Sequence, residues 1–101
     1  MARFEVRAAR AEEALGLLGS ADRLNQPGFA PHMCRVGLLD GHIVAYALTM
    51  RRTLQYGRQR LRVIGIGEVF TRPEYRGRGY ATQVLQDTLT YVVEPGAHIA
   101  L

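Results

Sequence analysis

The sequence predicts an α/β (α+β) fold with a mixed, mainly antiparallel central sheet and helices on both faces. Three observations support this prediction. Apolar runs of strand length follow one another through the middle of the chain and are separated by glycine-bearing turns. Two segments carry apolar residues at helical spacing, one near the start and one in the last quarter. A final apolar run follows the second helix, so the last two strands are joined through a helix and are expected to lie parallel.

Length and composition limit residues 1–101 to one small globular domain. Of the 101 residues, 48% are hydrophobic and 22% are charged, which argues against a disordered chain. The net charge is +4 and is unevenly distributed: residues 51–78 hold eight arginines against two glutamates, a net charge of +6, and the rest sums to −2. The single Cys34 has no cysteine to pair with, and no apolar run is long enough to span a bilayer, so we expect a cytoplasmic protein.

The first predicted elements are a strand, a helix and a loop. Residues Arg3–Ala8 alternate between apolar and charged side chains, which is typical of a half-buried strand. A helix of two or three turns should follow, because apolar residues recur there at helical spacing. These residues are Ala11, Ala14, Leu15 and Leu18. The next residues, 19–34, have a loop composition, and a short helical piece is expected at 21–24.

A β-hairpin is the clearest local signal in the chain. Asp40-Gly41 supplies the positive φ that a tight hairpin turn needs, and it joins apolar strands at residues 35–39 and 42–48. The second of these strands is apolar on both faces. We therefore expect it inside a sheet that is covered on both sides.

A longer hairpin begins with the same strand. The strand is expected to run on to Arg52, to turn near Tyr56-Gly57 and to return over residues 60–71. Pro73 ends the returning strand, because proline has no N–H to donate to a neighbouring strand.

The second helix is expected to begin at Gly79 and to end at Pro95-Gly96. One stripe at helical spacing should face the sheet: Ala81, Val84, Leu85, Thr88, Leu89 and Val92. Polar side chains should occupy the opposite face: Gln83, Gln86, Asp87, Thr90 and Glu94. Residues 97–101 then start the final strand.

The segment between the last long strand and this helix, residues 68–82, combines glycines with arginines. Glycines let backbone N–H groups come close to a ligand, and the first N–H groups of the helix have no partner within it. The helix dipole favours an anion there, and Arg72, Arg76 and Arg78 add positive charge. The segment therefore predicts a phosphate-binding loop. The alternative reading of its glycines is a tight connection between strand and helix.

These residues resemble the signature of the GCN5-related N-acetyltransferase (GNAT) superfamily, whose members transfer an acetyl group from acetyl-CoA to an amine. The match is Arg76-x-x-Gly79-x-Ala81, preceded by Pro73-Glu74-Tyr75 and followed by Leu85. The position of the match between strand and helix, the order of the predicted strands and the basic loop agree with this family. The long arginine-bearing hairpin with a glycine-rich strand also resembles acetyltransferases related to the enhanced-intracellular-survival proteins.

The resemblance implies acetyl-CoA as the cosubstrate and no metal. In this family, backbone N–H groups of the loop bind the CoA pyrophosphate, and the strand before the loop lies beside the pantetheine arm. Carried onto this sequence, the strand contributes Val69, Phe70 and Thr71. The loop and the start of the helix contribute Arg76, Gly77, Arg78, Gly79, Tyr80, Ala81 and Thr82. The guanidinium groups of Arg72 and Arg78 either contact phosphate or are solvated.

Direct acetyl transfer to a primary amine requires a group that takes a proton from the amine. Glu68 is the only acid on the strand before the loop, and the family often uses a glutamate from this region. Glu68 is therefore the candidate base, and the alternative is a surface carboxylate paired with a hairpin arginine. The acceptor amine stays open, because the loop at 19–34 and residues absent from this chain would shape its pocket.

The chain ends at Leu101, inside the strand at which the CoA cleft of the family opens. We expect a single GNAT-like domain truncated within this strand; the alternatives are a second chain that completes it or a degenerate module. An apolar terminal strand leaves an open edge, from which we expect a homo-oligomer.

A non-catalytic acetyltransferase-like module, which binds CoA or a protein partner, is the alternative to an enzyme. Nucleic-acid binding ranks below both, because the arginines concentrate on the hairpin and the phosphate loop. No membrane partner is expected.

Overall fold

The computed structural model of the chain describes residues 2–18, 30, 33–93 and 96–100. Its elements are β1 (Phe4–Ala8), α1 (Ala11–Leu18), β2 (Cys34–Leu39), β3 (His42–Tyr56), β4 (Gln59–Thr71), the 3₁₀ turn η2 (Pro73–Tyr75), α3 (Tyr80–Tyr91) and β5 (His98–Ala100). The helical piece expected at 21–24 lies outside the described residues, as does Leu101.

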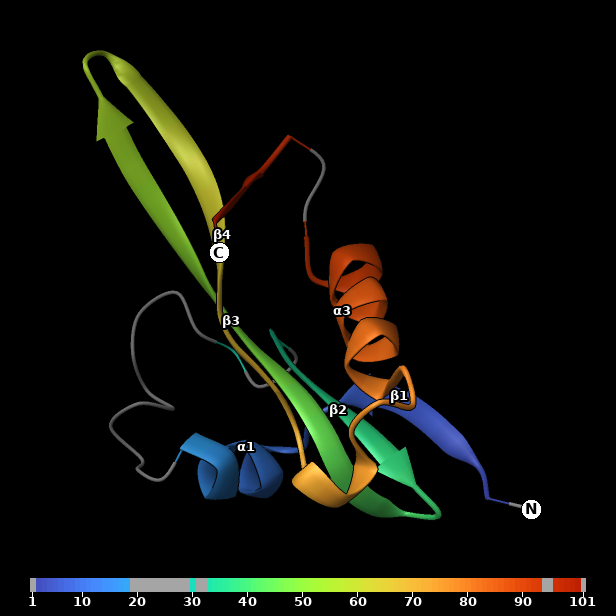
Figure 1. Ribbon diagram of the computed structural model, residues 1–101. Helices are drawn as coiled ribbons and strands as arrows, with labels where there is room; N and C mark the ends of the chain where they lie inside the picture. The colour runs from blue at the N-terminus through green and yellow to red at the C-terminus, as the bar shows by residue number, and fades with distance from the viewer. Residues whose placement is uncertain (1, 19–29, 31–32, 94–95, 101) are drawn as a thin grey trace.

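The five strands form one sheet in the order β1-β2-β3-β4-β5 (Figure 1). The first four pair antiparallel, and β5 pairs parallel to β4. The mixed sheet expected from the sequence is therefore confirmed. β5 pairs with Val63–Gly65 of β4, so the part of β4 at residues 66–71 has an open edge on that side within the described chain.

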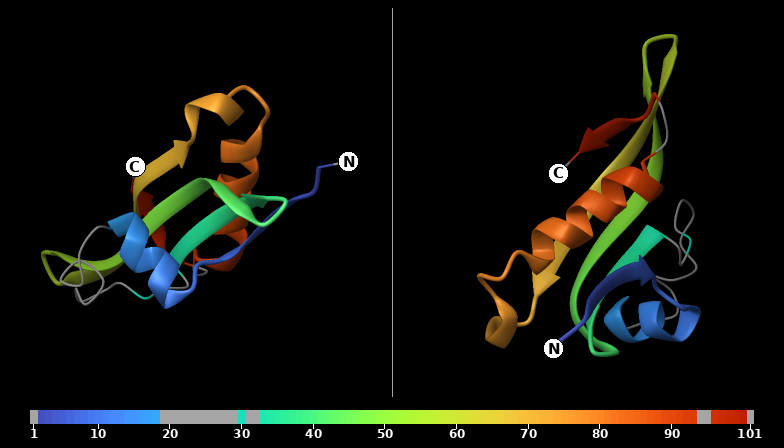
Figure 2. Two further views of the ribbon diagram at one scale, coloured as in Figure 1. Left: turned by 90° about the horizontal axis from the view of Figure 1, so that it is seen from below. Right: turned by 90° about the vertical axis from the view of Figure 1, so that its right-hand side faces the viewer.

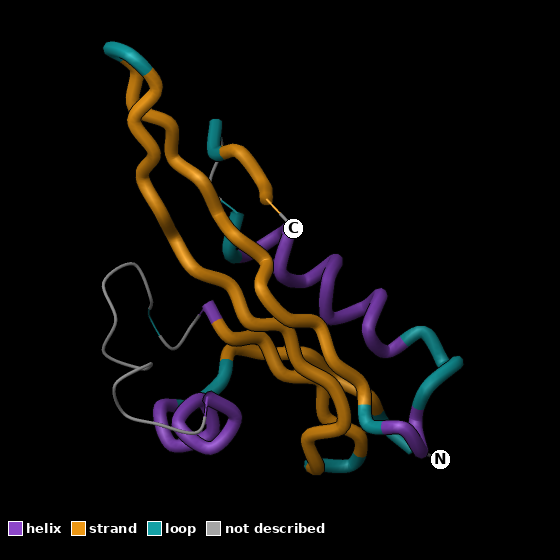
Figure 3. Tube along the Cα trace, turned by 60° about the vertical axis from the view of Figure 1, so that its left-hand side comes forward, coloured by secondary structure: helices purple, strands orange, loops and turns teal. Residues whose placement is uncertain are grey.

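Helices cover both faces of the sheet, α1 on one and α3 on the other (Figures 2 and 3). Strand alternation explains how each face acquires its core. The core beneath α1 contains Ala9, Ala14, Cys34, Val36, Leu38 and Leu48. The core beneath α3 contains Ala45, Ala47 and Val84, with Phe4, Val6 and Tyr80 packed against them.

The pairing of β3 with β4 contains a β-bulge at Gly67. Leu48 lies opposite Glu68 and Thr49 lies opposite Ile66, so Gly67 is an extra residue in β4. A bulge bends and twists its strand locally. This one lies directly before the segment that leads into the glycine loop.

The long hairpin extends further than the sequence indicated. β3 continues to Tyr56 and not to Arg52, and the turn lies at Gly57, whose φ is +60°. β2 pairs with β3 only as far as Leu48. Beyond this point the two strands of the hairpin, residues 49–66, project from the body of the domain as a two-stranded ribbon (Figure 1). The projection accounts for an elongated molecule of 54 × 27 × 19 Å.

The stripe predicted for the second helix is partly wrong. Val84, Thr88 and Val92 are buried, but Leu89 is 42% exposed. Asp87, which was expected on the solvent face, lies partly buried in an ion pair with Arg35 of β2. The helix is thus rotated so that its Asp87 side faces the sheet, because an arginine on the neighbouring strand compensates the carboxylate. Neither described helix is long and apolar enough to cross a membrane.

Candidate functional site

The connection from β4 to α3 depends on two glycines in the left-handed region. Gly77 and Gly79 both have φ of +80°, a conformation that side-chain-bearing residues rarely adopt. A Cβ at either position would have no heavy atom within 4 Å, so both glycines border open space. Glycine is therefore required at these positions by the left-handed backbone conformation, and not by close packing. The absence of a side chain also leaves the backbone accessible to a ligand.

The start of α3 presents unpaired N–H groups. Its first hydrogen bond runs from the N–H of Gln83 to the carbonyl of Gly79 at 3.1 Å. The N–H groups of Tyr80, Ala81 and Thr82 therefore have no acceptor within the helix, and no side chain caps this end. These donors and the positive end of the helix dipole favour an anion at this position.

A pocket of about 500 Å³ lies beside the glycine loop, and we call it the loop pocket. It is lined by Val69, Phe70, Thr71, Tyr75, Arg76, Gly77, Gly79, Tyr80, Ala81 and Thr82. Nine of the ten residues expected to bind the cofactor are thus brought together. Arg78 is the tenth and does not line the pocket. Tyr75 also lines the pocket; the sequence showed it next to the signature but did not indicate that its side chain faces the cofactor site.

Thr71 contributes a buried, unpaired hydroxyl group to the loop pocket. Its Oγ1 is buried and has no hydrogen-bond partner within the described structure. Buried hydroxyl groups are nearly always hydrogen bonded, because an unmade bond costs about 1–3 kcal/mol. The hydroxyl thus lacks a hydrogen bond in the free chain, and a polar ligand that displaces the atoms covering it would supply one.

Two arginines of the loop are held by aromatic and backbone contacts. Arg76 donates from Nε to the carbonyl of Thr71 at 3.1 Å, and its guanidinium lies 5.9 Å from the centre of the Phe70 ring. Arg78 lies 5.5 Å from the centre of the Tyr75 ring. Arg76 therefore fastens the loop to the end of β4, and both guanidinium groups stay close to the loop.

Glu68 lies on the other face of β4, outside the loop pocket. It accepts a hydrogen bond of 2.7 Å from the hydroxyl of Tyr46 on β3, and Tyr46 also packs against Phe70 with ring centres 5.4 Å apart. The hydrogen bond that the structure shows for Glu68 thus comes from a tyrosine. Tyr46 was missed in the sequence, because its proximity to Glu68 depends on the strand register.

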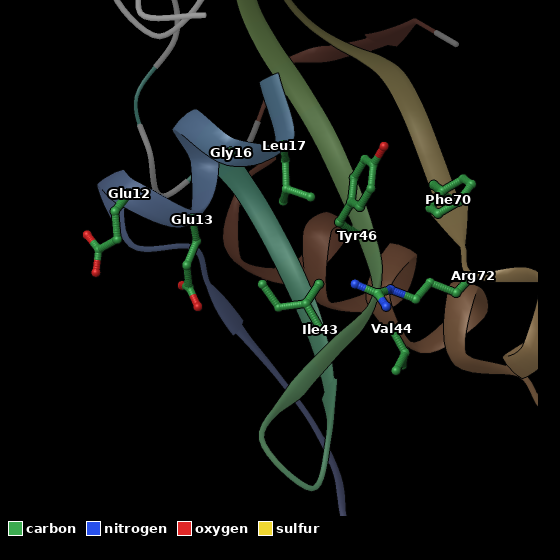
Figure 4. A pocket seen from close by; sticks show the side chains of 9 residues that line it. All are labelled: Glu12, Glu13, Gly16, Leu17, Ile43, Val44, Tyr46, Phe70 and Arg72. Atoms are coloured by element: carbon green, nitrogen blue, oxygen red, sulfur yellow. The ribbon is translucent and has the colours of Figure 1, made fainter. Parts of the chain in front are cut away.

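A second pocket, the α1 pocket, lies between α1 and the strands β3 and β4 and has a volume of about 280 Å³ (Figure 4). Its lining residues are Glu12, Glu13, Gly16, Leu17, Ile43, Val44, Tyr46, Phe70 and Arg72. Phe70 belongs to both pockets. The two pockets therefore approach each other at the open edge of β4.

Glu13 and Cys34, on the α1 side of the sheet, have shifted pKa values. The side-chain hydrogen bond from Arg7, with the backbone N–H of Arg10, lowers the pKa of Glu13 to about 2. Burial raises the pKa of the Cys34 thiol to about 12. Cys34 is completely buried beneath α1, which makes it a core residue and not a nucleophile.

A mixed sheet of this order, with a helix on each face and a glycine loop between β4 and a helix N-terminus, defines the class of acyl-CoA N-acyltransferase folds. The family model for the acetyltransferase (GNAT) domain matches residues 8–101, so the chain belongs to this family.

Solved structures with the same fold are distant in sequence. An acetyltransferase from Vibrio fischeri superposes with a TM-score of 0.73 at 20% identity, over 94% of this chain and 92% of that protein. The aminoglycoside N-acetyltransferase AAC(6')-Iy, in complex with CoA, gives 0.69 at 16% identity, over 99% of this chain and 76% of that protein.

A GCN5-related N-acetyltransferase from Anabaena variabilis gives a TM-score of 0.64 at 24% identity over 87% of this chain. This chain spans 25% of the length of that protein. No curated protein sequence matches the chain. The closer relation to enhanced-intracellular-survival-type acetyltransferases is not supported by these comparisons.

Proposed function

We propose that this chain is the cofactor-binding part of an N-acetyltransferase that transfers an acetyl group directly from acetyl-CoA to an amine. The observation that carries the proposal is the unpaired, buried hydroxyl of Thr71 in the loop pocket, next to a helix start whose N–H groups are also unpaired. Both features fit an elongated ligand that has polar groups along its length and an anionic group at one end. The family to which the chain belongs, and the complex of AAC(6')-Iy with CoA, support acetyl-CoA as that ligand.

The chain's own residues would hold the cosubstrate in two parts. The N–H groups of residues 77–82 bind the pyrophosphate, as an anion at a helix start. The open edge of β4 at Val69–Thr71 offers backbone groups to the amides of the pantetheine arm, as a neighbouring strand would. This arrangement directs the thioester toward the bulge at Gly67, and the cosubstrate supplies the acetyl group there.

Glu68 is the group that we assign to proton transfer. The amine nitrogen bonds to the acetyl carbon, the carbon–sulfur bond breaks with the electron pair leaving on sulfur, and the carboxylate of Glu68 takes the proton from nitrogen. Tyr46 holds this carboxylate by a hydrogen bond of 2.7 Å. Glu68 adjoins both Gly67 of the bulge and Val69 in the chain, and this closeness to the position that we propose for the thioester supports its role.

Calorimetry and a thiol-release assay test the proposal. The chain is titrated with CoA and, for comparison, with 3′-dephospho-CoA and ADP, and it is then incubated with acetyl-CoA and a panel of primary amines. We expect CoA to bind and at least one amine to be acetylated. A lack of CoA binding would contradict the proposal, and CoA binding without transfer to any amine would instead favour the non-catalytic module.

A further inference from the structure

The α1 pocket combines an apolar wall with one unpaired positive charge. Leu17, Ile43, Val44, Tyr46 and Phe70 supply the wall. Two acids line it from α1. The carboxylate of Glu13 accepts from Arg7 at 2.7 and 2.9 Å and from the N–H of Arg10 at 2.8 Å, and the exposed side chain of Glu12 points away from Arg72 in Figure 4. The remaining cation of the lining is Arg72.

The guanidinium of Arg72 has neither an ion pair nor a hydrogen bond with another residue in the described part of the chain. The N–H of Arg72 donates to the carbonyl of Val44 at 2.8 Å, which anchors its backbone to β3. Figure 4 shows the side chain reaching from β4 across toward Tyr46 and Ile43. Its planar fork of N–H donors is thus held over the pocket and is suited to a carboxylate.

A negative charge lies farther along the same strand face. Glu68 and Phe70 alternate along β4, and Arg72 directly follows the strand in an extended conformation (φ −56°, ψ 138°), so the three residues share a face. At the rise of a strand, the Cα atoms of Glu68 and Arg72 are about 13 Å apart. Tyr46 and Phe70 form an aromatic surface between the two charges, with ring centres 5.4 Å apart. Glu68, the aromatic surface and Arg72 together are complementary to a molecule that has an amine at one end, a carboxylate at the other and an apolar middle.

We propose that the α1 pocket binds the acceptor amine and that Arg72 selects an acceptor bearing a carboxylate, of the amino-carboxylic acid class. This inference rests on the proposed acetyl transfer, because Glu68 then takes the proton from the amine of the same acceptor. Arg72 binds the carboxylate, and the aromatic pair contacts the apolar middle. An uncharged amine of the same shape leaves the guanidinium without its anion and is a poorer acceptor.

The test compares two pairs of acceptors that differ in one charge: 6-aminohexanoate with 6-aminohexanamide, and 8-aminooctanoate with 8-aminooctanamide. Acetylation rates with saturating acetyl-CoA give kcat/KM for each. We expect the acid to exceed its amide by about tenfold or more in at least one pair, since a charge-assisted hydrogen bond contributes about that much. Equal rates, or faster acetylation of the amide in both pairs, would overturn the inference and leave the acetyltransferase proposal intact.

Two variants separate the effect of Arg72 from a general change of charge. R72Q should lose the preference for the acid through a rise in the KM for the acid, and R58Q, which removes one arginine at the tip of the ribbon, should keep the preference. Circular dichroism establishes that both fold. If wild type acetylates neither pair, NMR titration of the CoA-loaded chain with 6-aminohexanoate and its amide decides: binding of the acid that R72Q abolishes supports the inference, and its absence refutes it.

Discussion

The ring of Phe4 stacks on the ring of Tyr80 with centroids 4.2 Å apart and an interplanar angle of 12°. Phe4 belongs to the first strand, and Tyr80 is the first residue of α3 after the glycine loop. The same Phe4 ring lies over Gly37 of β2, where a Cβ would come within 2.7 Å of Cζ. The first strand therefore supports the start of the helix that presents the unpaired N–H groups.

Gly37→Ala should destabilise the domain, because the added methyl group would meet Phe4 at 2.7 Å and Val84 at 2.9 Å. Overpacking of this kind costs about 1–3 kcal/mol in the free energy of unfolding, which urea titration measures. Gly65→Ala is the control, since its nearest neighbour would be the carbonyl oxygen of Met50 at 3.7 Å. Equal losses in the two variants would refute the role of Gly37 in close packing.

Gly79→Ala should weaken CoA binding as well as stability. Its φ of +80° costs an alanine about 1–2 kcal/mol, and relief of this strain would move the N–H groups at the start of α3. Gly57→Ala, at the tip of the ribbon with φ of +60°, imposes a similar backbone cost far from the loop. We expect both variants to lose stability by thermal unfolding and only Gly79→Ala to lose CoA affinity by calorimetry; an unchanged affinity would count against the loop as the pyrophosphate site.

Thr71→Val should reduce CoA affinity without reducing stability. The hydroxyl that it removes is buried and unpaired, so its loss relieves a desolvation penalty in the free chain and removes a ligand contact in the complex. We expect the unfolding temperature to stay equal or rise, while the dissociation constant for CoA increases by about three- to tenfold. A loss of stability would mean that the hydroxyl has a partner in the free protein.

Glu68→Gln should lower the rate of acetyl transfer by about a hundredfold or more, the usual contribution of a general base. CoA affinity should stay unchanged, because Glu68 lies outside the loop pocket. Tyr46→Phe removes the hydrogen bond that orients the carboxylate and should give a smaller loss of kcat. Both are measured as initial rates of thiol release at several pH values, and wild-type rates in Glu68→Gln would exclude this residue as the base.

The pair formed by Glu13 and Arg7 should make stability depend on acidic pH. The folded-state pKa of Glu13 is lowered from 4.5 to about 2, so its contribution is complete above pH 4.5 and is lost as the pH falls toward 2. The hydrogen bond from the Arg10 N–H also caps the start of α1. Glu13→Gln should cost about 1 kcal/mol at pH 7 and flatten the pH dependence of urea unfolding below 4.5; an unchanged acid transition would show that other carboxylates cause it.

Local sequence patterns were sufficient to predict the class of fold and most of the glycine loop. The alternation of β1, the turn at Asp40-Gly41 and the stop at Pro73 are properties of neighbouring residues, and each element that they predict is present within a few residues. The glycine loop is local in the same way. The glycines at 77 and 79 and the start of α3 adjoin in the chain, so their spacing alone indicated that they share a pocket.

Contacts between distant segments could not be predicted from the sequence, because they depend on strand register and helix rotation. The bulge at Gly67 decides which β3 side chain lies near Glu68, and a shift of one residue would turn that carboxylate to the opposite face. The rotation of α3 brings Asp87 to Arg35 in place of solvent.

The sequence by itself thus determined the family and the glycine loop, since both depend on residues that are close together in the chain. The tertiary structure decided that Tyr46 holds Glu68, that Arg72 turns toward α1, and that Phe70 adjoins both pockets. The physical reason is that these side chains meet across strands, where the pairing of the whole sheet sets their distances.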